Sequence, residues 1–228
     1  MTLSPPLVSM MTDELLIGRY HRHLDSLVEL ARREVERTKR WQPHLNDLAW
    51  FYLHELSDVR RVFRDVYGSN LASAFRKHRD AGKLEIITCG ATHGFFPLID
   101  PVPQADRAQV HVAVQHYRKH FGRAPDGIWL PECAYTPGHE VFLKEAGLRF
   151  SFLESHGLTD AHPHPSHGVH APIVSPGGIV FFGRDMESSR QVWSSESGFP
   201  GDFDYREFYK DVGWELPMED LADFLPDG

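Results

Sequence analysis

The sequence predicts an α/β protein in which short parallel strands alternate with helices. Residues 104–121 carry apolar side chains at helical spacing and are followed by Gly122, which predicts a helix. A further helix is expected from Thr136, with Pro137 at its first position, to Gly147. Strands that alternate with helices imply a parallel sheet, either open or closed into a barrel. Four short apolar runs are the predicted strands: residues 84–89, 127–130, 150–153 and 179–182.

The part of the chain before the first strand is predicted to be helical. A long helix is expected from Thr12, a good N-cap residue, to about Arg40, where a cation suits the helix C-terminus. Two further helices are expected at about residues 45–67 and 71–79, the second closed by Gly82. We find no internal repeat, and the chain is long enough for one sizeable core.

Composition excludes several classes of partner. The chain has 228 residues, a formal net charge of -8 and no long basic run, so we expect no nucleic-acid partner. No apolar run is long enough to cross a bilayer, so we expect no membrane partner either. With only Cys89 and Cys133, and no signal-peptide pattern at the N-terminus, we expect a reducing compartment, the cytoplasm.

Glu132 and His93 follow two of the predicted strands, where chemistry collects in parallel α/β folds. A carboxylate at position 132, beside Trp129 and Tyr135, can attack a sugar's anomeric carbon or hold a proton. The alternative is a glutamate that accepts backbone N–H groups near a helix start. His93 can hydrogen-bond a sugar hydroxyl or orient a carboxylate, and the alternative is a structural loop histidine.

The residues that follow the fourth predicted strand include an arginine and several aromatic side chains. Arg184 can bind hydroxyls or a carboxylate, and its alternative role is an ion pair with Asp185 or another nearby acid. Residues 186–210, approximately, are predicted to be a long loop over the active face. The aromatic side chains in this segment either stack on glucose rings or form a satellite hydrophobic cluster. They are Trp193, Phe199, Phe203 and Tyr205.

A histidine-rich stretch suggests a metal site, but its pattern does not support one. Four histidines occur within nine residues, interleaved with prolines and a glycine: His162, His164, His167 and His170. Zinc requires ligands in a fixed tetrahedron, and this spacing matches no zinc motif. We therefore expect a proline-stiffened loop, no metal and no cofactor, with a metal-dependent hydrolase as the alternative. Cys133 has no evident base partner and is interpreted as a small wall residue.

Several segments together resemble glycoside hydrolase family 57, and within it the 1,4-α-glucan branching enzymes. Residues 127–135 resemble the family's nucleophile segment, and residues 85–94 its active-site histidine segment. Residues 182–194 and 199–209 are similar to the branching-enzyme subgroup. The likeness covers nearly the whole chain, and the segments agree in order and spacing.

The resemblance implies a (β/α)7 barrel with parallel strands and an outer layer of helices. It also implies cleavage of an α-1,4 bond in an α-glucan with retention, followed by transfer to a 6-hydroxyl. By position, Glu132 would be the nucleophile and His93 would line the donor subsite. Arg184 and Gly201 would contact substrate, and Trp193 would wall the site.

Two departures from the family predict a barrel truncated at both ends. No strand with a His-x-Pro segment precedes Met1, and the family's acid/base aspartate is expected beyond Gly228. The acids available here match no such segment: Asp185, Glu187, Asp202 and Asp204. We therefore expect little activity from this chain alone and self-association through exposed barrel edges. Amylase or 4-α-glucanotransferase activity, or a non-catalytic glucan-binding role, are the alternatives.

Overall fold

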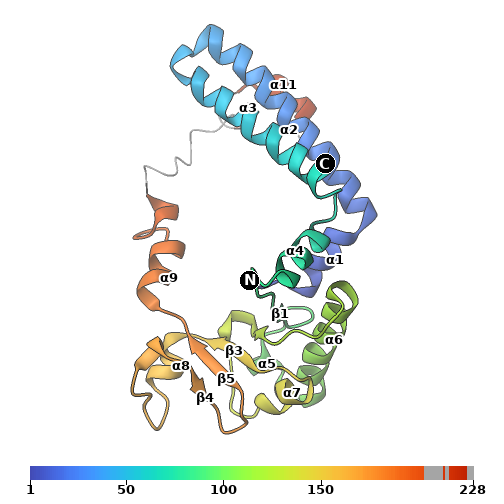
Figure 1. Ribbon diagram of the computed structural model, residues 1–228. Coiled ribbons are helices and arrows are strands. Elements are labelled where there is room, and N and C mark those ends of the chain that lie inside the picture. Colours follow the sequence, from blue (N-terminus) through green and yellow to red (C-terminus); the bar gives the residue numbers. More distant parts are fainter. Residues whose placement is uncertain (203–212, 214–215, 225–228) are drawn as a thin grey trace. The chain divides into compact units, whose positions relative to one another are not determined.

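The computed structural model of the chain describes residues 1–202, 213 and 216–224, and these form two compact units (Figure 1). One unit contains residues 1–9 and the described residues from Phe75 to Asp202. The other contains residues 10–74 and those described from Gly213 onward. The sequence analysis treated residues 1–228 as one partial barrel. That domain assignment stays a prediction, and within the structure the N-terminal helices form their own unit because they bury apolar side chains against each other.

The first unit is built on short strands that are mostly parallel, as predicted. In Figure 1, β5 lies between β3 and β4. β3 is parallel to β5, whereas β4 is antiparallel to it and was not predicted. The bridge between Gly127 and Phe150 joins this sheet to the parallel pair β1 and β2. The strands are β1 (Thr88–Cys89), β2 (Ile128–Trp129), β3 (Phe150–Leu153), β4 (Ile173–Val174) and β5 (Val180–Gly183).

The first strand is shorter than its apolar run. Only the last two of residues 84–89 form β1. Ile87 makes a parallel bridge with Thr2, and the carbonyl of Ile86 accepts a hydrogen bond from the hydroxyl of Tyr117 at 2.9 Å. Residues 86–89 of the run are buried, and at Ile86 the Tyr117 side chain, not a neighbouring strand, forms the hydrogen bond to the carbonyl.

Helices cover one face of this sheet around an apolar core. The longest is α6, which begins with Pro103 and ends at Gly122, whose φ of 79° is left-handed as a C-cap glycine requires. Val110 and Val114 of α6 belong to the same buried cluster as Ile128 of β2 and Phe181 of β5. The α-helices that contribute residues to this unit are α1 (Pro5–Thr12), α4 (Leu71–Asp80), α5 (Phe96–Ile99), α6 (Pro103–Phe121), α7 (Glu140–Glu145), α8 (Ser155–Thr159) and α9 (Met186–Trp193).

Two predicted helix starts were wrong. Thr12 ends α1, and the N-cap of the long helix is Asp13, whose carboxylate accepts the N–H of Leu16 at 2.9 Å. Thr136 does not begin a helix: residues 137–139 form a turn, and the N–H of Thr136 donates to Nδ1 of His139 at 3.1 Å. The helix α7 begins at Glu140 instead.

The second unit is a helical hairpin. Figure 1 shows α2 (Glu14–Trp41) alongside α3 (Asn46–Arg61), which continues through a π-helical turn to Val66. The buried stripe of α2 contains Leu24, Val28, Ala31 and Val35, as the apolar spacing predicts. Short turns at Met218–Leu221 (α11) and residues 222–224 complete the described part.

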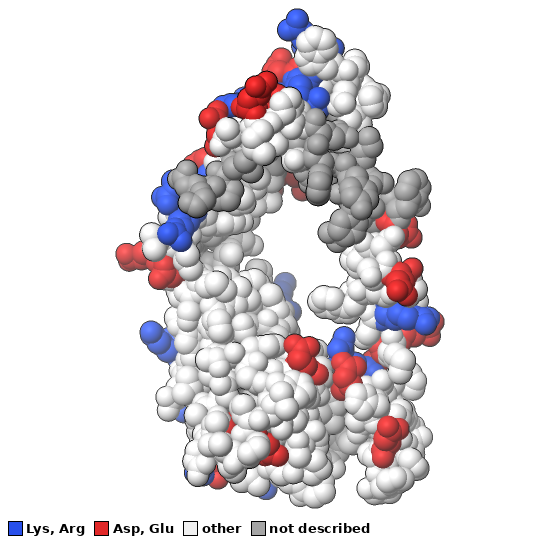
Figure 2. All heavy atoms as spheres, turned by 180° about the vertical axis from the view of Figure 1, so that it is seen from behind, with Lys and Arg blue, Asp and Glu red and all other residues white. Residues whose placement is uncertain are grey.

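The surface carries charges of both signs. On the face shown in Figure 2, acidic and basic side chains are interspersed over the described residues. Among the described helices, none has the length and apolar character needed to cross a bilayer.

Candidate active site

Glu132 and His93 lie beside each other at the carboxyl ends of neighbouring parallel strands. Oε1 of Glu132 is 3.3 Å from Nε2 of His93. His93 is four residues beyond Cys89 of β1, and Glu132 is three beyond Trp129 of β2, and these strand residues pair directly. The Glu132 side chain is 72% exposed and that of His93 49%. Among the described hydrogen bonds, none joins a backbone N–H group to the Glu132 carboxylate, so the structure does not support its alternative role as an acceptor of backbone N–H groups.

The backbone is left-handed at both residues. The φ angle is 55° at Glu132, 53° at Cys133 and 60° at His93. Residues other than glycine rarely adopt this region, and it costs about 1–2 kcal/mol for each. Such outliers persist only where surrounding contacts hold them, and they cluster at functional sites. The two loops are therefore held in shapes that their own residues disfavour.

Cys89 completes a chain of contacts from the core to the carboxylate. Its Sγ is 3.3 Å from Nδ1 of His93. Burial, as the main cause, raises the pKa of the Cys89 thiol to about 11, so the thiol keeps its proton at neutral pH. A protonated thiol can donate to Nδ1, which leaves the ring proton on Nε2, facing Glu132.

Arg184 pairs with Glu154, which follows β3. The Arg184 guanidinium donates to Oε1 of Glu154, and its central carbon lies 5.8 Å from the ring centre of Trp129. The acid that pairs with Arg184 is therefore Glu154, not Asp185. Burial raises the pKa of the nearby Cys133 thiol to about 11, and Arg184 opposes this. The Cys133 thiol therefore keeps its proton at neutral pH, and its role as a wall residue stays a prediction.

An aromatic layer covers the sheet face opposite to the core. Ser151 and Leu153 of β3 are buried on the core side, and the alternate residues point the other way. The rings of neighbouring members lie 5.6 to 6.0 Å apart. We call this layer the aromatic floor, and one of its members, Trp129, is three residues before Glu132 in the chain. Its members are Trp129, Phe150, Phe152 and Phe182.

Part of the segment predicted to be a long loop is a helix. The prediction was wrong for residues 186–193, because Asp185 caps α9 by accepting the N–H of Ser188 at 2.7 Å. Hydrogen bonding from the Ser188 side chain, and then from its backbone N–H, lowers the pKa of Asp185. An aspartate held ionised in this way is a poor proton donor.

The structure does not bring the other predicted site residues into contact with Glu132. Trp193 is 75% exposed at the end of α9. Gly201 packs closely on its own segment, because an added Cβ would meet the carbonyl oxygen of Ser195 at 1.8 Å. No described contact joins either residue to the Glu132–His93 pair. Three predicted residues lie outside the described residues: Phe203, Asp204 and Tyr205.

The histidine-rich loop holds its side chains by local contacts. The rings of His162 and His164 lie 4.6 Å apart, and Nδ1 of His164 is 3.0 Å from the carbonyl oxygen of Thr159. Within the described chain, the potential metal ligands that converge lie elsewhere, at Asp100, Asp106 and His139.

These three residues do not form a suitable metal site. The N–H of Thr136 donates to Nδ1 of His139, so the ring proton must be on Nε2, 3.4 Å from Oδ1 of Asp100. His139 therefore presents an N–H group where a metal would need a lone pair. Asp106 is fully buried, and neither carboxylate oxygen has a protein hydrogen-bond partner among the described residues. Burial raises its pKa.

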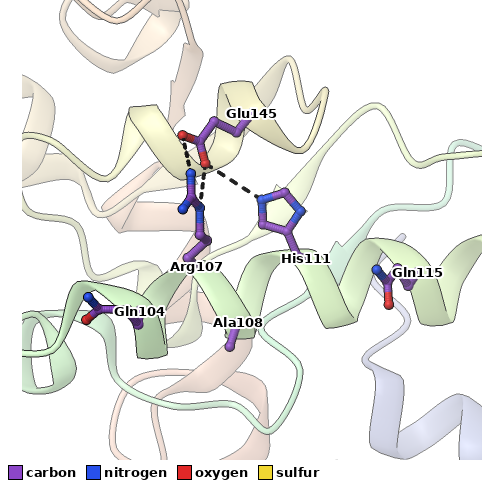
Figure 3. A pocket seen from close by; sticks show the side chains of 6 residues that line it. All are labelled: Gln104, Arg107, Ala108, His111, Gln115 and Glu145. Atoms are coloured by element: carbon purple, nitrogen blue, oxygen red, sulfur yellow. Dashed lines mark hydrogen bonds and ion pairs between the residues drawn. The ribbon is translucent and has the colours of Figure 1, made fainter.

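A pocket lies along an exposed side of α6, away from the catalytic candidates (Figure 3). It has a volume of about 690 Å³. In Figure 3, Arg107 points at Glu145, and the two form a bidentate ion pair with distances of 2.7 and 2.8 Å. The guanidinium is therefore already neutralised, and the lining has no aromatic plate for a sugar. The lining residues are Gln104, Arg107, Ala108, His111, Gln115 and Glu145.

Sequence reasoning missed three residues that support the site. Glu154 directly follows the predicted strand 150–153, but its pairing with Arg184 depends on the β3–β5 register. Gln109, which contacts the His93 loop, carries no motif signal inside a helical stripe. The paired role of Cys89 could have been suspected from its place four residues before His93.

An exposed carboxylate beside a histidine, at the ends of parallel strands and near an aromatic floor, is an arrangement suited to enzymes that act on glycosidic bonds. The family model for glycosyl hydrolase family 57 matches residues 9–225. The chain belongs to this family.

Relatives of the chain include branching enzymes. A 1,4-alpha-glucan branching enzyme of Thermococcus kodakarensis is 30% identical over 237 residues, which cover 91% of this chain and 34% of that protein. A probable 1,4-alpha-glucan branching enzyme of Mycobacterium tuberculosis is 31% identical over 191 residues, covering 78% of this chain and 35% of that protein. The chain thus spans about a third of the length of these relatives.

Similar solved structures include enzymes of two activities. The alpha-amylase AmyC of Thermotoga maritima has a TM-score of 0.93 and 42% identity, covering 99% of this chain and 43% of that one. A branching enzyme of the same family from Pyrococcus horikoshii has a TM-score of 0.81 and 33% identity, covering 92% of this chain and 41% of that one. Both activities are therefore found among proteins of closely similar structure.

The left-handed backbone at Glu132 predicts that glycine is more stabilising than alanine at this position. The variant Glu132→Gly should be more stable than Glu132→Ala by about 1 kcal/mol, because glycine adopts a left-handed φ without a Cβ clash. Urea unfolding of the two variants measures this difference. At Lys144, inside α7, the order should reverse, with alanine more stable than glycine. The same order at both positions would contradict strain at Glu132.

Burial of Asp106 predicts a stability that falls as pH rises. Its pKa is raised in the folded state, so the fold binds a proton that the unfolded chain releases, and stability declines as pH climbs from about 4 through the folded pKa. The Asp106→Asn variant should lose this component and be more stable at neutral pH by about 1 kcal/mol. Melting curves across pH test this, with the exposed Asp160→Asn as control. Parallel pH profiles for wild type and Asp106→Asn would refute it.

Proposed function

We propose that the chain carries the nucleophile of an α-glucan-active enzyme that works with retention, and that this nucleophile is Glu132. The observation that supports it most is the 3.3 Å contact between the exposed carboxylate of Glu132 and Nε2 of His93 at the ends of two parallel strands. In the attack, an oxygen of Glu132 bonds to the anomeric carbon as the bond to the leaving oxygen breaks. The expected substrate is an α-1,4-linked glucan.

His93 supports this role by donating from Nε2. A hydrogen bond from Nε2–H to one carboxylate oxygen orients Glu132. As the glycosyl ester forms, negative charge leaves the carboxylate, and the same N–H group is freed to bind a sugar hydroxyl of the donor. Arg184, fixed over Trp129 by Glu154, is placed to hold the glucan beside the aromatic floor.

Retention also needs a second carboxyl group, about 5–5.5 Å from the nucleophile, that donates a proton to the leaving oxygen. We assign this role to none of the acids at this edge. Glu154 is engaged in an ion pair with Arg184, and Asp185 is engaged as a helix cap.

We favour transfer to a 6-hydroxyl, the branching reaction of glycogen or starch biosynthesis, as the fate of the glucan. The curated relatives named above support this choice. Hydrolysis is the second candidate, because the alpha-amylase AmyC is 42% identical over nearly the whole chain. We also propose that the parallel strands belong to a (β/α)7 barrel and that the segment around α9 lies over its active face.

A trapping reagent tests the nucleophile. A 5-fluoro-α-glucosyl fluoride should place one fluoroglucosyl group on Glu132, because fluoride leaves without protonation and the fluorine at C5 slows hydrolysis of the ester. Peptide mass spectrometry locates the label. The variant Glu132→Gln should remain unlabelled, whereas Glu154→Gln should still be labelled. A label on another carboxylate, or none, would overturn the assignment.

The fate of the trapped ester separates branching from hydrolysis. If transfer is the reaction, added maltooligosaccharide should release the label several-fold faster than buffer alone, since the acceptor hydroxyl replaces water as the attacking group. Nuclear magnetic resonance of the product should then show an α-1,6 linkage. Equal release with and without acceptor would favour the amylase reaction instead.

A further inference from the structure

The loop that carries His93 rests on the side chain of Gln109. The imidazole itself is half exposed, so packing around the ring does not fix its direction. Its backbone does, because the N–H of His93 donates to the carbonyl of Gly90 at 3.1 Å and closes a tight turn. That turn is attached to α6 through Gln109.

Gln109 contacts the turn at three points. Its Oε1 accepts the N–H of Thr92 at 2.9 Å, and its Nε2 donates to Oγ1 of Thr92 at 2.6 Å. The backbone carbonyl of Gln109 accepts the N–H of Ala91 at 3.1 Å. Both ends of the carboxamide are used, so the side chain is held in one orientation and holds the two residues before His93.

Close packing makes this attachment rigid. A Cβ added at Gly90 would lie 3.4 Å from Oε1 of Gln109 and 3.2 Å from both Phe96 and Pro131. A Cβ added at Gly94 would lie 3.4 Å from the Gln109 carboxamide. Pro131 directly precedes Glu132. The turn is therefore packed between Gln109 on one side and the loop of Glu132 on the other.

We propose that Gln109 is a positioning residue for the His93–Glu132 pair, an inference that rests on the proposed role of Glu132. The left-handed φ of 60° at His93 is costly and needs outside contacts to persist. Gln109 supplies those contacts. Without the carboxamide, the turn relaxes, the imidazole moves away from Glu132, and the nucleophile loses its oriented donor.

Three variants test the role by the rate at which the 5-fluoro-α-glucosyl fluoride labels Glu132. Gln109→Ala should slow labelling by about tenfold or more, since small misplacements of catalytic groups have effects of this size. Gln109→Glu should restore most of the rate, because a carboxylate accepts both the N–H and the hydroxyl proton of Thr92. The matched control is Gln115→Ala, on the same helix but facing the outer pocket, which should label at the wild-type rate.

A double-mutant cycle separates positioning from general stability. His93→Gly removes the imidazole and suits a positive φ. If Gln109 acts through His93, Gln109→Ala should slow labelling no further in the His93→Gly background. An equal further loss in that background would overturn the proposal. If Gln109→Ala does not fold, Thr92→Val, a change at an exposed residue, removes only the 2.6 Å hydrogen bond and should slow labelling less.

Resonances of the His93 ring keep this inference distinct from the proposed function. They should shift in Gln109→Ala and return near their wild-type positions in Gln109→Glu, whether or not the protein reacts. Wild-type protein without a label on Glu132 would refute the nucleophile assignment alone. Ring resonances or labelling rates that are unchanged in folded Gln109→Ala would refute the positioning role alone.

Discussion

The register between β1 and β2 is the constraint on which the candidate site depends. Because Cys89 pairs with Trp129, the loops that follow these strands leave the sheet side by side. A shift of the register by one residue would turn every side chain to the opposite face and separate His93 from Glu132. The strained backbone at both positions then sets the final 3.3 Å contact. Strand pairing thus brings the loops together, and their local conformation aims the side chains.

Further hydrogen bonds and an ion pair hold the side chains of the site in this geometry. Gln109 holds the turn before His93, and the buried, protonated thiol of Cys89 faces the other nitrogen of its ring. On the next strand, Glu154 holds Arg184 over Trp129. The site is therefore assembled from the ends of four strands, β1, β2, β3 and β5, and from one helix, α6. His93 is supported by Gln109 and Cys89, and Arg184 is held by Glu154, and we assign no chemical step to these supporting residues.

The sequence predicted four of the five described strands from their apolar runs, and it singled out Glu132 and His93 because they follow strands. The structure brings these two side chains together, and their roles stay predictions. The sequence did not predict the partners of those residues. Glu154 and Gln109 act through contacts made by distant segments, which leave no local pattern in the chain. Two of the errors concern helix N-caps. The N-cap of the long helix is Asp13 and not Thr12, and Asp185 caps a helix where a loop was expected. The roles of Trp193 and Gly201 stay predictions, since no described contact brings them to the pair.

The two native thiols have a practical consequence for studies of this protein. With pKa values of about 11, Cys89 and Cys133 have roughly one thiolate in a thousand molecules at pH 8. Both are also buried. Maleimide and iodoacetamide reagents would therefore find little to alkylate in the folded chain. A single cysteine placed at an exposed position, for example in α9, would serve as a selective attachment point for a spectroscopic reporter without removal of the native pair.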